Sequence, residues 1–209
     1  MLPFETFDMA ARSGVHENRS TARSLLPGAV AGAVAFVAGY AATFLLKSAE
    51  LSNLPLGPAQ DALGSGVAPP ADWQVIGWFF YQMHNVGTTV SVAAVGQSQS
   101  TATTGNVATW MLFVPIVALV VSGFLVGRYA GVGSGRTAAL GGASIGTGYG
   151  ALAVAFALLT NWSASATAFG QSVTLSIGPS PLPAVLLAGL LYPIAFGALG
   201  GALAGAVPE

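Results

Sequence analysis

His84 is the side chain with the clearest chemical potential, because it stands in a dense aromatic stretch, Trp73 to Asn85. Imidazole changes its charge near neutral pH, and with Asn85 it could line a pocket for an apolar or quinone-like ligand. A metal is not expected there, because no second histidine or carboxylate stands at ligand spacing. The alternative is an anchor at the lipid–water boundary, where aromatic rings are enriched. The sequence leaves both interpretations open.

A ligand pocket at this stretch would draw on aromatic side chains from two later segments as well. The candidate ligand-binding residues are Trp78, Tyr81, His84, Asn85, Tyr149 and Tyr192. In this hypothesis residues 73–85 form a lid over the outer mouth of a helical bundle. Such an apolar pocket would take lipid, quinone or carotenoid, and no other cofactor is predicted.

The sequence offers little for catalysis. The chain has no cysteine, which excludes thiol nucleophiles, thiolate metal sites and disulfides. No Ser-His-Asp arrangement, carboxylate pair or metal triad can be assembled on one face of a membrane. Residues 131–137 (GVGSGRT) resemble a phosphate-binding loop, but Ala130 and Arg136 stand where that motif needs glycine and lysine. We therefore expect neither an enzyme nor a nucleotide-binding protein.

The composition indicates an integral membrane protein. Of the 209 residues, 54% are hydrophobic and 6% are charged, whereas about 25% are charged in an ordinary soluble domain. The net charge of −1 gives no basic patch, so nucleic acid is not an expected partner. The expected partner is the lipid bilayer of the plasma membrane.

Four uncharged stretches are long enough to cross a hydrocarbon core of about 30 Å, which needs about 20 helical residues. The predicted spans are residues 25–46, 108–127, 137–160 and 183–207. A cytoplasmic head then covers residues 1–23, and outer loops cover residues 47–107 and 161–182. The predicted fold is an all-α membrane protein in a single domain, 1–209, with an interfacial or re-entrant aromatic helix at about 73–85.

The two outer loops differ in their patterns. Residues 87–106 are rich in Ser, Thr, Gln and Gly, which is typical of turns. Residues 172–177 (SVTLSI) alternate polar and apolar side chains, which is compatible with a small strand.

The arginines set the expected orientation, because cytoplasmic loops carry an excess of positive charge. With both termini in the cytoplasm, all five arginines lie inside and only Lys47 lies outside. Counting residues 73–95 as a fifth span would move Arg128 and Arg136 to the outer face. It would also put Gln82, His84 and Asn85 at membrane depth, so we prefer four spans.

Glycines four residues apart occur in every predicted span and allow neighbouring backbones to approach closely. The strongest predicted helix-packing sets are Gly142, Gly146, Gly150, Gly197, Gly201 and Gly205. They could form seams inside the bundle, or the Gly197–Gly205 ridge could face another subunit. Pro193 should kink the last span, because it cannot donate a backbone hydrogen bond.

Asn161 begins an Asn-Trp-Ser sequence on the predicted outer side, which makes it a glycosylation candidate. Asn18 begins a similar sequence on the predicted inner side, where no modification is expected.

Two segments carry a resemblance to known proteins: Ile76 to His84 (IGWFFYQMH), and Leu186 to Pro193 (LLAGLLYP) followed by Phe196 to Gly201 (FGALGG). With the arginine-led first span they resemble a group of small haloarchaeal multi-pass membrane proteins of unassigned function. The resemblance implies four spans in an archaeal plasma membrane and supplies no activity or catalytic residue.

The leading hypothesis is therefore a non-enzymatic integral membrane protein. It would act as a structural or accessory subunit that associates with itself or with a larger membrane complex through glycine-rich helix faces. The alternative is a small transporter or apolar-ligand binding protein whose outer lid is the 73–85 segment.

Overall fold

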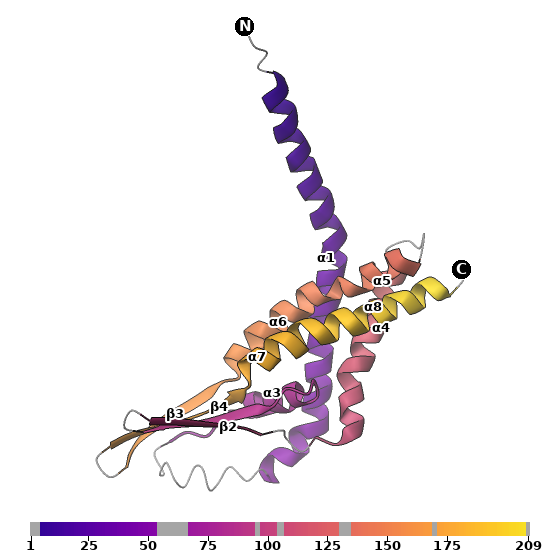
Figure 1. The fold of residues 1–209 in the computed structure, drawn as a ribbon. Coiled ribbons are helices and arrows are strands. Elements are labelled where there is room, and N and C mark those ends of the chain that lie inside the picture. Colours follow the sequence, from indigo (N-terminus) through magenta and orange to yellow (C-terminus); the bar gives the residue numbers. More distant parts are fainter. Residues whose placement is uncertain are drawn as a thin grey trace.

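The computed structural model describes residues 5–53, 67–94, 97–103, 107–129, 135–168 and 171–207, without the side chains of 5–25 and 168. Helices make up most of this part of the chain, and a small sheet lies at one end (Figure 1). The helical segments are α1 (Glu5–Lys47), η1 (Ser48–Asn53), α3 (Asp72–Gln82), η2 (Thr109–Leu112), α4 (Phe113–Tyr129), α5 (Gly135–Ala143), α6 (Ile145–Leu159), α7 (Pro181–Pro183), η3 (Ala184–Leu191) and α8 (Tyr192–Ala206). The strands are β1 (Thr88–Ala94), β2 (Gln97–Thr103), β3 (Trp162–Ala168) and β4 (Gln171–Pro179).

Four helical stretches of the described chain are long and apolar enough to cross a membrane, as the sequence predicts. They are Leu26–Leu51, Thr109–Tyr129, Gly135–Leu159 and Pro181–Ala206. Only 28% to 33% of the most apolar window of each stretch is buried within the protein. The outward surface of these helices is therefore mostly apolar, which suits lipid rather than water.

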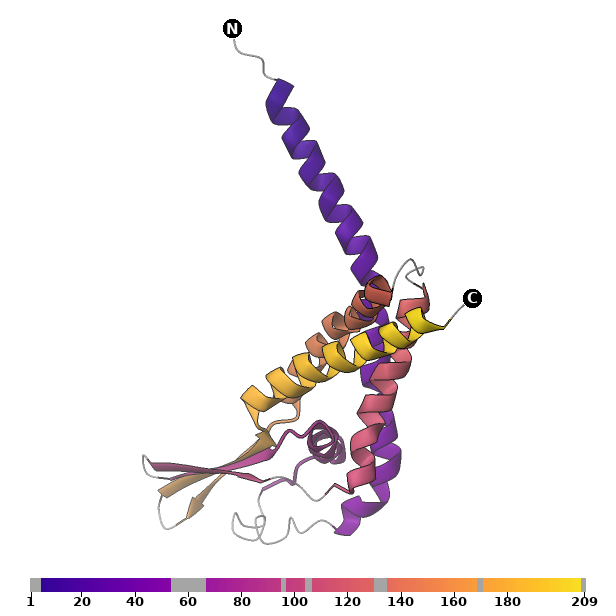
Figure 2. The same ribbon diagram turned by 45° about the vertical axis from the view of Figure 1, so that its right-hand side comes forward.

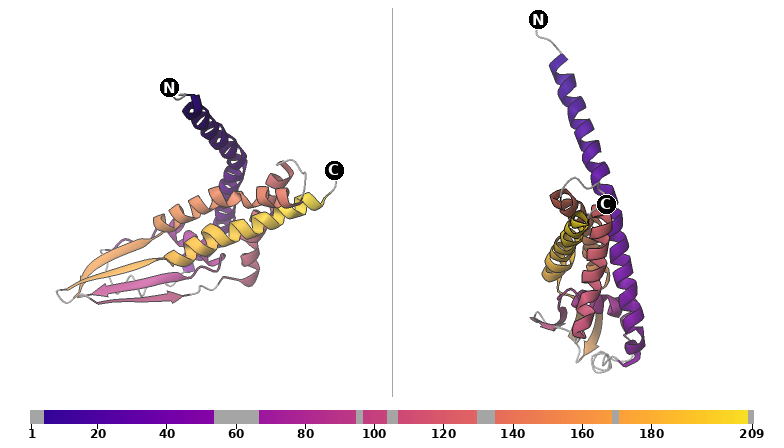
Figure 3. Two further views of the ribbon diagram at one scale, coloured as in Figure 1. Left: turned by 45° about the horizontal axis from the view of Figure 1, so that its top comes forward. Right: turned by 90° about the vertical axis from the view of Figure 1, so that its right-hand side faces the viewer.

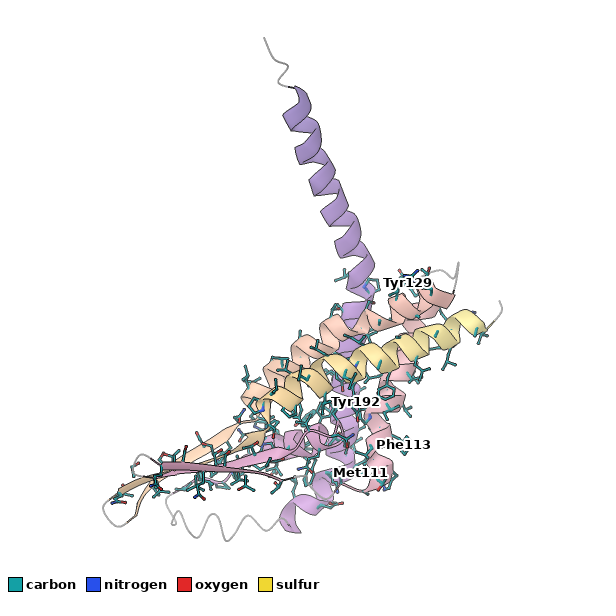
Figure 4. The ribbon with its side chains drawn as sticks, in the orientation of Figure 1. Met111, Phe113, Tyr129 and Tyr192 are labelled. Atoms are coloured by element: carbon teal, nitrogen blue, oxygen red, sulfur yellow. The ribbon has the colours of Figure 1, made fainter. Side chains whose placement is uncertain are left out.

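The four stretches form two crossing pairs. α1 and α4 run side by side, and the α5–α6 stretch and α8 lie together and cross them (Figures 2 and 3). α8 packs against both α4 and α5. Figure 4 places Tyr129 at one end of α4, and Met111, in η2, at the opposite end, beside the sheet. The described ends of α1 and α8 that carry the termini lie on the Tyr129 side (Figure 1).

Two helices depart from a simple span. Residues 5–23, expected as a polar head, continue the first helix, since α1 begins at Glu5. In the last stretch, η3 is a π-helix that ends at Leu191, and Pro193 is the second residue of α8. The N–H of Tyr192 donates to the carbonyl of Leu187, five residues back. Pro193 has no N–H, and the wider turn before it is the local irregularity that a proline introduces.

The sheet is antiparallel, with strand order β2-β1-β4-β3. β1 and β4 form its centre, and Thr88 pairs with Thr103 on one side and with Pro179 on the other. Val90 pairs with Ile177 and Val92 pairs with Leu175, so the two central strands present apolar side chains on one face. The alternate positions are mostly Ser and Thr.

The all-α prediction was therefore too narrow. The strand at 172–177 is confirmed as part of β4, but the turn-rich region at 87–106 contains the hairpin of β1 and β2. β2 (QSQSTAT) carries no large apolar side chain, so it lacks the alternation that identifies a strand in a sequence. Pairing with β1 satisfies the backbone hydrogen bonds on one side of β2, and this depends on the fold rather than on local pattern.

Other parts of the predicted loops fall outside the described residues. This holds for most of the GVGSGRT motif, residues 131–134, and for residues 54–66 of the first outer loop.

At the end of α1, Lys47 is 5% exposed and its Nζ lies 2.6 Å from Glu50. The same Nζ lies 5.1 Å from the ring centre of Phe79, so α3 packs beside the end of the first span.

Candidate functional site

α3 and the turn after it carry four of the six predicted ligand-binding residues. Asp72 stands in the first turn, where a carboxylate suits the positive end of the helix dipole. The side chain of Gln74 accepts a hydrogen bond of 3.0 Å from the N–H of Ala71, which occupies a free donor at the start of the helix. These polar residues place the start of α3, and the aromatic residues that follow turn it into the protein.

A tight turn ends the helix and leads into β1. The N–H of Val86 donates to the carbonyl of Tyr81 at 3.1 Å. Among the described non-glycine residues, Asn85 alone has a positive φ, 57°. Asparagine tolerates this left-handed conformation better than most residues. The sequence pattern of the aromatic stretch gives no sign of this turn.

His84 is fully buried at the end of α3. Its Nδ1 lies 2.8 Å from the carbonyl oxygen of Phe80. Because a carbonyl can only accept, Nδ1 carries the proton and Nε2 is the acceptor. The hydroxyl of Tyr149 lies 2.6 Å from Nε2 and donates to it. Burial lowers the pKa of His84 to about 4, and the bond to Phe80 opposes this only in part. The imidazole is therefore neutral at physiological pH.

Two tyrosines from different spans meet at this histidine. Tyr149 lies on α6 and is 1% exposed. Tyr192 begins α8, its ring centre is 5.1 Å from that of His84, and its hydroxyl accepts a hydrogen bond of 2.6 Å from the side chain of Asn85. The turn after α3 thereby contacts the third and the fourth span together.

Trp78 and Tyr81 fasten α3 to α6 through backbone carbonyls. The indole N–H of Trp78 donates to the carbonyl of Thr160 at 2.8 Å. Thr160 caps the end of α6, where carbonyls lack partners within the helix. The hydroxyl of Tyr81 donates to the carbonyl of Ala153. Burial raises the pKa of Tyr81, so its hydroxyl stays protonated and can only be used as a hydrogen-bonding group.

Aromatic rings from α1 and α6 enclose the remaining side of α3. The ring of Phe36 lies edge-on to those of Phe80, Tyr149 and Phe156, at centroid distances of 5.0, 5.3 and 5.6 Å. Edge-to-face pairs of this kind add about 0.5–1.5 kcal/mol each beyond their burial. Five of the six predicted residues thus come together in space, whereas Trp78 packs in a second cluster with Val75, Leu175 and Ile177. Because all six join α3 or its turn to the spans, we call them the α3 clasp: Trp78, Tyr81, His84, Asn85, Tyr149 and Tyr192.

Three grooves in the described part of the protein lie away from the α3 clasp. One of about 500 Å³ runs between α1 and α4 and is lined by residues that include Val30 and Tyr129. A second, of about 430 Å³, lies between the same helices toward Trp110. A third, of about 640 Å³, follows α6 and η3 past Gly150. No clasp residue lines any of these three grooves, and the lid formed by residues 73–85 stays a prediction.

The predicted packing glycines face other helices of the same chain. A Cβ added to any of the six would come within 3.0 Å of a neighbouring helix, mostly of its backbone. The partners are Gly197 and Gly201 for Gly142; Ile194 for Gly146; Gly189 for Gly150; Gly142 and Ile145 for Gly197; Ala138 and Gly142 for Gly201; and Gly135 and Ala138 for Gly205. The Gly197–Gly205 ridge thus lies against α5 and is not left open to another subunit.

Asn161 lies between α6 and β3. Its side-chain nitrogen donates to the carbonyl of Ala157 at 2.7 Å, and its backbone carbonyl accepts from Gln74 at 3.3 Å. The nitrogen that would carry a glycan is therefore engaged in closing the end of α6. Glycosylation of Asn161 stays a prediction. In the described part of the chain, no group of three or more His, Asp or Glu residues could hold a metal ion.

Sequence reasoning missed the partners of the clasp. Phe36 and Phe156 are ordinary apolar residues of long spans, and nothing in their spacing separates them from lipid-facing neighbours. The carbonyls of Ala153 and Thr160 have no side-chain signature at all. The available signal was the polar character of Trp, Tyr and His in a buried stretch, because such groups need partners.

The comparisons with known proteins place the chain beside one family. A family model described as "Family of unknown function (DUF7978)" matches residues 9–208. No curated protein and no solved structure matches the chain.

Proposed function

We propose that this chain, which belongs to the DUF7978 family, is a non-enzymatic integral membrane protein that serves as a structural or accessory subunit. Its four long apolar helices support the membrane location. The single observation that carries the rest is the α3 clasp, whose polar groups are engaged with one another and with the backbone.

The clasp supports a structural role because its titratable and hydrogen-bonding groups are already used. Both ring nitrogens of His84 have partners within the chain. The N–H of Trp78 and the O–H of Tyr81 donate hydrogen bonds to backbone carbonyls of α6 and its C-terminal cap. A side chain that acts on a substrate needs a free donor, acceptor or base directed at it. These residues instead hold α3 and the third and fourth spans in one arrangement.

The proposed orientation puts the sheet outside the cell and both termini in the cytoplasm of the plasma membrane. Arg128 and Arg136 stand where α4 ends and α5 begins, at the end of the bundle that carries the described ends of α1 and α8 (Figure 1). Lys47 lies at the opposite end. Positive charge gathers on the cytoplasmic side of spans, which supports this threading.

Association with a second copy or a larger complex is the second part of the proposal. The six predicted packing glycines contact other helices of the same chain, so the association surface lies elsewhere. The sheet, at the outer end of the bundle, is the described region that reaches farthest beyond the helices on that side (Figure 1).

Native mass spectrometry of the protein, extracted from its membrane together with surrounding lipid, tests the proposal. We expect a particle that contains more than one polypeptide. A particle that holds one chain alone, or a turnover activity that His84→Ala abolishes while the fold is kept, would contradict it.

A second candidate function is the binding of an apolar molecule such as lipid, quinone or carotenoid. The two grooves between α1 and α4 favour it, since each has a volume of several hundred Å³, in the range of ligand pockets, and is lined mainly by apolar side chains. Filling the second groove with Ala118→Trp should then displace a co-purified ligand. Val121→Trp, on the exposed side of the same helix, is the matched control.

A further inference from the structure

The chain contains two copies of one structural unit. The first sign of the repeat is that the two hairpins have the same register. Thr88 pairs with Thr103 in the first hairpin and Trp162 pairs with Ile177 in the second, each 74 positions after its counterpart. At the same offset the sequence repeats Ala-x-Gly-Gln-Ser, at residues 94–98 and 168–172. β1 thus corresponds to β3, and β2 corresponds to β4.

The helices after the hairpins repeat as well. α4 carries Pro115, and α8 carries Pro193, each followed by isoleucine. From these prolines the same spacing leads to Gly123 and Gly127 in α4 and to Gly201 and Gly205 in α8. A hairpin followed by a span is therefore the repeated unit, and its two copies stand side by side in the sheet.

The two units join through β1 and β4. β1 is the first strand of its hairpin, and β4 is the second strand of the other hairpin. In register, Val92 faces Leu175. This leaves two edges: β3, which corresponds to β1, and β2, which corresponds to β4. The two edge strands, β3 and β2, are therefore the counterparts of β1 and β4, which already pair with each other at the centre of the sheet.

In the part of the chain that the structure describes, both edges lack the usual protection against pairing. Each is seven residues long, with the sequences QSQSTAT in β2 and WSASATA in β3. Soluble proteins guard such edges with charge, proline or a covering segment. Neither strand contains a charged residue or proline, and every residue of β2 is exposed. Their unpaired backbone groups can be satisfied by a further strand.

We propose that β3 of one molecule pairs with β2 of a second copy, in the register of β1 with β4. Moving that register by 74 residues sets Ala166, the counterpart of Val92, opposite Thr101 of the second copy, the counterpart of Leu175. The interface is head-to-tail, so a ring of copies around an axis normal to the membrane leaves no edge unpaired. This inference rests on the self-association in the proposed function.

Cross-linking in native membranes tests the register, and the absence of cysteine from the chain makes single-cysteine variants direct. Ala166→Cys and Thr101→Cys chains, carrying different tags, are co-expressed and treated with a short bismaleimide. We expect a cross-linked pair that contains both tags. Ser165→Cys with Thr101→Cys is the matched control, because Ser165 is the neighbour of Ala166 on the opposite face and should cross-link far less.

Three results would overturn the pairing. They are no mixed-tag product, equal yields for Ala166→Cys and Ser165→Cys, or a dominant product between two Thr101→Cys chains, which would indicate two-fold pairing of β2. Native mass spectrometry on the same membranes separates the two proposals. A multi-chain particle without the Ala166–Thr101 product removes only the strand pairing, whereas a single-chain particle removes self-association as well.

Discussion

The hydroxyl oxygen of Tyr149 lies 2.6 Å from Nε2 of His84, although the two residues are 65 positions apart and neither reaches solvent. This bond joins the turn after α3 to the middle of the third span. It also fixes the imidazole in the neutral state with the proton on Nδ1, because Phe80 offers only a carbonyl. The arrangement explains why a histidine can be fully buried without a charged partner.

Removal of the Tyr149 hydroxyl should be costly. Tyr149→Phe leaves Nε2 of His84 buried without a donor, and an orphaned buried polar group costs about 1–3 kcal/mol. Tyr192→Phe is the control, since it removes the partner of Asn85, whose side chain is exposed rather than buried. We expect thermal unfolding in detergent to show a clear loss of stability for the first variant and a small one for the second. Equal losses would show that the buried bond has no special weight.

Acid should destabilise the folded protein through His84. Its pKa in the folded protein is about 4, below the ordinary 6.5, whereas in the unfolded chain it titrates near 6.5. Below pH 6.5 the unfolded state binds a proton that the folded state does not, so the free energy of unfolding falls as the pH drops toward 4. The contribution of His84 to stability is complete above pH 6.5.

Unfolding midpoints measured between pH 7.5 and pH 4.5 check this expectation. The midpoint should drop with acid in the native sequence and should drop less in His84→Gln, which cannot titrate. A midpoint that depends on pH equally in both proteins would mean that other groups cause the change.

The sequence predicted the helical layout well because the signal was composition over long windows. Four charge-free stretches can hardly be anything but buried or lipid-facing helices. Five of the six candidate site residues also come together in space, and Trp78 packs in a neighbouring cluster. The rings of Phe36 and Phe156 complete the packing around α3, and neither could be singled out from the sequence.

The sheet was the main feature that local patterns could not reveal. β2 has no apolar alternation, and β1 has only Val90 and Val92 among Thr, Ser and Ala. β1 also pairs with β4, which lies more than 70 residues after β1. A comparison of the sequence with itself at an offset of 74 residues could have revealed β1 and β2. β2 corresponds to β4 at this offset, and the pattern of β4 is clearer.

Glycine contacts should be sensitive to a single added methyl group. A Cβ on Gly142 would overlap the carbonyl oxygen of Gly197, which is backbone and cannot move aside without shifting α8. We expect Gly142→Ala to cost about 1–3 kcal/mol, as overpacking does. Gly135→Ala in the same helix is the control, since nothing lies within 4 Å of its added Cβ. Unaltered unfolding of Gly142→Ala would contradict the observed helix contact.

The threading of the chain is the claim on which the proposed functions depend, and cysteine accessibility in intact cells tests it most directly. Ser98 in β2 and Gly135 at the start of α5 are both exposed and lie at opposite ends of the bundle. With a maleimide that cannot cross membranes, Ser98→Cys should be labelled in intact cells, and Gly135→Cys only after the membrane is opened. Labelling of Gly135→Cys in intact cells, or protection of Ser98→Cys, would contradict the account.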